Sequence, residues 1–88
     1  MADLLGEKLS QVEQIRKNTA EGVLYSSQAA RKMEDLASRV YATASSSSSG
    51  ERAVYVLKDA ASEMESIASS LSEAVSQMET YINTLQNA

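Results

Sequence analysis

Five residue types are missing from the chain: proline, cysteine, histidine, tryptophan and phenylalanine. Without cysteine and histidine there is no disulfide, thiol nucleophile or imidazole, so we expect no Ser-His triad, no metal site and no cofactor. An enzyme is therefore the weakest functional alternative. Glycine is also scarce, at 3 of 88 residues. With so few turn-forming residues and many good helix formers, the composition predicts an all-α protein.

Basic residues are absent from the last third of the chain. No lysine or arginine follows Lys58, whereas five acidic residues do, and the net charge is −4. Nucleic acids and anionic membranes bind clustered basic side chains, so we expect neither as a partner. We interpret the acidic residues as a solvated helix face.

The sequence has no apolar run of membrane-spanning length and no basic segment followed by an apolar one at its start. We therefore expect no membrane insertion and no Sec signal peptide, and a cytoplasmic location before any export.

One strong break divides the chain, at Ser45-Ser46-Ser47-Ser48-Ser49-Gly50. Serine and glycine are poor helix formers, so we predict helices over 3–43 and 51–86, joined by a turn over 45–50, in one domain spanning 1–88. Ser48 and Glu51 have the spacing of a capping box at the start of the second helix. Neither half can bury its apolar stripe alone, which favours a packed antiparallel hairpin over a flexible linker.

Apolar residues recur at alternating spacings of three and four in the second half, as in a heptad seam. The seam consists of Val54, Leu57, Ala61, Met64, Ala68, Leu71, Val75, Met78, Ile82 and Leu85.

The first half repeats the pattern less strictly. Its predicted seam combines Leu5, Val12, Thr19, Ser26, Met33 and Val40 with Ile15, Gly22, Ala29, Leu36 and Thr43. The small residues in its middle predict a close approach of the second helix there.

Each predicted helix also has an apolar flank beside its seam. The flank of the first helix contains Val23, Ala30, Ala37 and Ala44, and that of the second contains Ala53, Ala60, Ile67, Ala74 and Tyr81. In this frame each flank faces polar residues of the other helix, so both stay uncovered. We therefore predict partner-binding residues at Ala60, Ile67, Ala74, Tyr81, Val23, Ala30 and Ala37, and a four-helix bundle completed by a partner chain.

Two helices of about 40 residues around a glycine-containing turn, in an acidic, cysteine-free chain, resemble the WXG superfamily of small helical hairpins associated with type VII secretion. Ser48-Ser49-Gly50 stands where the family has Trp-x-Gly, and Tyr81-Ile82-Asn83-Thr84-Leu85 stands where it has Tyr-x-x-x-Asp/Glu. These departures make the chain most similar to the WXG-like helper proteins that accompany LXG toxins.

The resemblance implies a non-catalytic adaptor that binds the helical N-terminal domain of a partner toxin for export by a type VII system. Two alternatives stay open: a self-assembling coiled-coil subunit unrelated to secretion, which would be a homodimer, and an exported effector that itself acts on a host.

Overall fold

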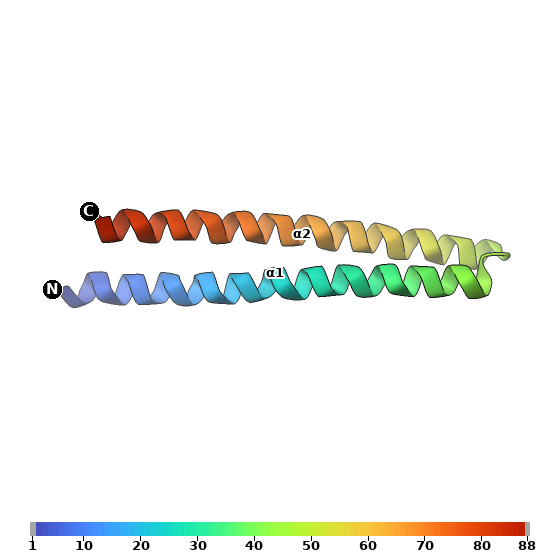
Figure 1. Ribbon diagram of the computed structural model, residues 1–88, viewed down its shortest axis with the longest axis horizontal. Coiled ribbons are helices and arrows are strands. Elements are labelled where there is room, and N and C mark those ends of the chain that lie inside the picture. The colour runs from blue at the N-terminus through green and yellow to red at the C-terminus, as the bar shows by residue number, and fades with distance from the viewer. Residues whose placement is uncertain (1, 88) are drawn as a thin grey trace.

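The computed structural model describes residues 2–87, so Met1 and Ala88 lie outside it. It consists of two long helices, α1 (Ala2–Ala44) and α2 (Ser48–Asn87), and it contains no strand in this range. The helices lie side by side and antiparallel, with both chain ends at the same end of the rod (Figure 1). The rod measures 68 × 14 × 13 Å. The predicted all-α hairpin is confirmed; the larger bundle stays a prediction.

The turn is shorter than predicted, because α2 begins at Ser48 and includes Gly50 in its first turn. Ser47, not Ser48, caps the helix: the Gly50 N–H donates a hydrogen bond to the Ser47 Oγ at 3.0 Å, and the Glu51 N–H donates to the Ser47 carbonyl at 3.0 Å. The Ser47 hydroxyl also donates to the Ala44 carbonyl at 3.1 Å. Ser47 therefore joins the end of one helix to the start of the next.

Gly50 is buried where α2 crosses the last residue of α1. A Cβ placed at Gly50 would overlap the carbonyl oxygen of Ala44 and lie 2.8 Å from the Ala44 Cβ. No Cβ fits this space without a backbone shift, so a side chain of any size would push the two helices apart at the turn.

The seam predicted for α2 is confirmed. Val54, Ala61 and Ala68 are buried, and the other seven seam residues are half-buried. Leu71 reaches across to α1, since its Cδ1 lies 3.2 Å from the position of a Cβ on Gly22.

One of the two rows of the seam predicted for α1 is wrong by one residue, and Leu5, the first residue of the other row, is exposed. Ala30 and Ala37 are only 2% and 1% exposed, whereas Ile15, which was assigned to the seam, is 55% exposed. The side of α1 that contacts α2 therefore combines Val12, Thr19, Ser26, Met33 and Val40 with Arg16, Val23, Ala30, Ala37 and Ala44.

Small residues hold the two helices close together. The buried hydrophobic residues of the described chain are four alanines, Ala30, Ala37, Ala61 and Ala68, with Val54. The antiparallel register sets Met33 level with Ala61 and Met64 level with Ala30. These two levels each pair a small residue with a large one, whereas Ser26 and Ala68, which are also level, are both small and buried. Among residues 4–87 no leucine, isoleucine, methionine or tyrosine is buried.

The steric role of Gly50 predicts that Gly50→Ala lowers the free energy of unfolding by about 2–3 kcal/mol, as an overpacked site does. Gly6→Ala is the matched control, because a Cβ at Gly6 meets nothing within 4 Å. In an exposed helix, alanine stabilises over glycine by up to about 1 kcal/mol. Thermal melts followed by circular dichroism at one protein concentration compare the two; equal melting temperatures would contradict the described turn.

The seam predicts that Leu71→Ala costs about 2–3 kcal/mol, the low end of the range for leucine because Leu71 is only half-buried. Ser69→Ala, two residues away on an exposed position, should leave the melting temperature unchanged. Identical urea midpoints for the two variants would mean that Leu71 does not pack against α1.

Candidate protein-binding face

One long side of the hairpin is apolar and only partly covered. Each heptad has two seam positions. The residue just before the first of them points at right angles to the plane that contains the two helix axes. In the observed register these residues of α1 and α2 lie on the same side of the hairpin. We call them the apolar face: Ile15, Gly22, Ala29 and Leu36 from α1, and Ala53, Ala60, Ile67, Ala74 and Tyr81 from α2.

The exposed fractions show how open this face is. Ile15 is 55% exposed, Ile67 45% and Tyr81 40%, and the six other members are half-buried. None of the nine carries a charge. A continuous uncharged strip that includes large exposed side chains is typical of an association surface.

Four of the predicted partner-binding residues lie on the apolar face: Ala60, Ile67, Ala74 and Tyr81. The other three lie elsewhere, because Val23 is half-buried on the side of α1 that contacts α2, and Ala30 and Ala37 are buried there. The expectation of an uncovered flank is wrong for Ala30 and Ala37, and Val23 is partly covered. The small size of the two alanines, which lets the helices approach, is the reason they are inside.

Sequence reasoning placed Ile15, Gly22, Ala29 and Leu36 in the core and so missed them as surface residues. Their position next to another row of apolar residues, Val23, Ala30, Ala37 and Ala44, signals that one of the two rows is a flank, although it does not say which one. When two neighbouring rows are both apolar, only one can occupy the seam, and the other becomes a flank.

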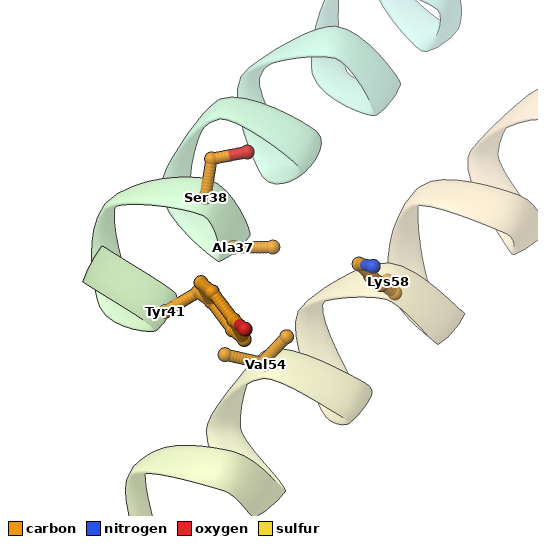
Figure 2. Close-up of a pocket in the computed structure, with 5 residues that line it drawn as sticks. All are labelled: Ala37, Ser38, Tyr41, Val54 and Lys58. Atoms are coloured by element: carbon orange, nitrogen blue, oxygen red, sulfur yellow. The ribbon is translucent and has the colours of Figure 1, made fainter. Parts of the chain in front are cut away.

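The opposite side of the hairpin is polar. It presents Glu13, Ser27, Glu34 and Tyr41 from α1 with Lys58, Glu65, Ser72 and Glu79 from α2. Near the turn it has a shallow depression of about 220 Å³, with Ala37 and Val54 between the side chains of Tyr41 and Lys58 (Figure 2). A polar surface of this kind stays solvated, which leaves the apolar face as the candidate binding surface.

Arg16 is the one charged residue on the side of α1 that contacts α2, and it turns its guanidinium toward the polar side. Its Nη2 donates a hydrogen bond to the Glu13 Oε1 at 2.6 Å, and its Nε donates to the same carboxylate at 3.1 Å. These hydrogen bonds lower the pKa of Glu13 and raise that of Arg16, with a smaller contribution to the latter from the charge of Glu79. The alkyl part of Arg16 can then cover the seam while its charge stays paired.

Neither helix has a stretch long and apolar enough to cross a membrane over residues 2–87. Within the same range no group of acidic side chains is placed to hold a metal ion. Comparison with protein-family models, with curated proteins and with solved structures finds no match for this chain.

The lowered pKa of Glu13 predicts how its pair with Arg16 depends on pH. A carboxyl group with a depressed pKa stabilises the fold above its unfolded pKa, and this stabilisation is lost as the pH falls through its folded pKa. We expect Glu13→Gln to melt below the wild type at pH 7, and the difference to shrink as the pH falls below the ordinary glutamate pKa of about 4.3 and to vanish below the lowered pKa of Glu13 in the folded protein. A difference that persists there would assign the effect of the substitution to packing.

Proposed function

We propose that this protein is a non-catalytic adaptor that uses its apolar face to bind two helices of another protein, completing a four-helix bundle. The partner that its resemblance to WXG-like helper proteins implies is the helical N-terminal domain of an LXG-type toxin. The adaptor would present this domain to a type VII secretion system.

The proposal rests on one observation: the hairpin buries few apolar side chains, whereas its apolar face leaves several of them exposed. The chain exposes 6443 Å², about a quarter more than the roughly 5,000 Å² expected of a compact protein of this mass. Small scaffolds with so little buried surface gain stability by association. A partner that covers Ile15, Ile67 and Tyr81 would supply the burial that the hairpin lacks.

Gly50 supports the resemblance to the WXG superfamily, from which the proposed partner is taken. Gly50, the glycine shared with the family's Trp-x-Gly turn, is needed because a Cβ there would overlap Ala44. The hairpin can therefore keep this glycine, which lies in the first turn of α2, for a steric reason even where it lacks the tryptophan.

Co-expression with an LXG-type toxin tests the function. We expect the two proteins to elute together in size-exclusion chromatography, with a mass by light scattering that equals the sum of the two chains. The toxin's isolated helical domain should give the same result, since the apolar face binds helices. Separate elution of the two proteins would refute the adaptor function.

Ile67→Glu should abolish this complex, because it places a carboxylate in a desolvated interface. The helix content of the variant should stay that of the wild type, since the side chain at position 67 is 45% exposed in the hairpin. Ser66→Glu is the matched control: it adds the same charge one residue away, on an exposed position off the apolar face, and should bind normally. Circular dichroism and light scattering measure both quantities; joint loss of helicity and binding would make Ile67 a core residue.

A further inference from the structure

Each helix has a row of exposed residues along the outer edge of the apolar face. These residues stand three after or four before members of the face, so they are its neighbours on the helix surface, on the side away from the other helix. We call the row on α1 the α1 edge: Gln11, Asn18, Tyr25, Lys32 and Arg39. The row on α2 is the α2 edge: Val56, Glu63, Ser70, Gln77 and Thr84. A helix that packs on the face also contacts the edge beside it.

The charges of the two edges are few and are separated by sign. Lys32 and Arg39 lie on the α1 edge, and Glu63 lies on the α2 edge. Among the described residues Lys32 and Glu63 form no ion pair, and Arg39 forms one with Asp35, at 3.6 Å and with side chains 71% and 65% exposed. So exposed a pair is weak, which leaves all three charges available to a partner.

We infer that the helix that a partner places over α1 has an acidic edge, with carboxylates opposite Lys32 and Arg39. This inference rests on the proposed function only in that the face binds two helices, whichever protein supplies them. It names the charge of the partner at the edge, whereas the uncharged face itself selects by shape.

The opposite signs of the two edges decide which helix of the partner is the acidic one. Lys32 and Arg39 are seven residues apart, about 10 Å along the helix, so acidic residues at heptad spacing on a neighbouring helix match both. Over α2 the same helix would place a carboxylate against Glu63, and like charges across an interface are unfavourable. The acidic helix therefore lies over α1.

The uncharged part of the edges decides where along the rod the acidic residues lie. Toward the chain ends the edges present Gln11, Asn18 and Tyr25 on α1, and Ser70, Gln77 and Thr84 on α2. A carboxylate beside these residues would meet no opposite charge on the edge. The acidic residues of the partner therefore lie in the half of the rod that contains the turn (Figure 1).

Two synthetic helical peptides test the inference. Both have the same stripe of leucine and alanine, about 28 residues long, and they differ only in having glutamate or lysine beside this stripe. We expect the wild-type chain to bind the glutamate peptide about tenfold more tightly, in titration calorimetry at about 0.15 M salt, where distant charges are screened. The chain has a net charge of −4, so attraction by overall charge would give the opposite order.

Lys32→Glu/Arg39→Glu should reverse this preference, because it makes the α1 edge acidic. Lys17→Glu/Arg31→Glu is the matched control: it makes the same change in net charge, at exposed positions of α1 that lie off the α1 edge, and should keep the preference. All four side chains are exposed, so circular dichroism should show the same helix content in both variants.

Equal binding of the two peptides, a preference for lysine, or binding of neither peptide would overturn the inference. A reversal of the preference by both double variants alike would assign it to overall charge and would overturn the inference too. Preference for glutamate without a complex between the chain and the LXG-type toxin would refute only the adaptor function. The toxin complex without this preference would refute only the acidic edge of the partner.

Discussion

The close approach of α1 and α2 through alanine is the constraint on which the rest of the structure depends. Ala30, Ala37, Ala61 and Ala68 leave no room between the helices for a large side chain, so every leucine and methionine of the seam packs from the edge. Edge packing covers such side chains on one side only. The hairpin is therefore held in register by many small contacts, and its large apolar residues remain available to a neighbour.

The hairpin was predictable because its signals are strong and local. A run of serines ending in glycine breaks the only helical pattern, and α2 places large residues at strict heptad spacing. The frame of α1 was not predictable from hydrophobicity, because Ile15 and Leu36 are more apolar than Arg16 and Ala37 and yet lie outside the seam. The frame of α1 is decided by how closely the two helix backbones can approach each other. This distance is a property of the helix pair, so the sequence of one helix does not reveal it.

A shift of one residue in this frame changes the functional interpretation. In the predicted frame the two apolar flanks lie on different sides of the hairpin, and each faces polar residues. In the observed frame Ala30 and Ala37 move inside, and the row containing Gly22 and Ala29 joins the row containing Ile67 on one side. Four of the predicted binding residues therefore keep their place, and they gain as neighbours residues that the sequence had assigned to the core.

The division of the surface into an apolar and a polar side restricts how the hairpin can associate. Acidic residues such as Glu65 and Glu79 line the side opposite the apolar face, where like charges oppose contact between copies. On the apolar face itself there is no charge and few hydrogen-bonding groups, so selection among partners depends on shape. Ile67 and Tyr81 project from this face, at 45% and 40% exposed, whereas Gly22 and Ala74 between them carry little side chain of their own. A partner helix pair must therefore present small side chains where Ile67 and Tyr81 project, because large side chains at those levels would clash with them and keep the helices apart.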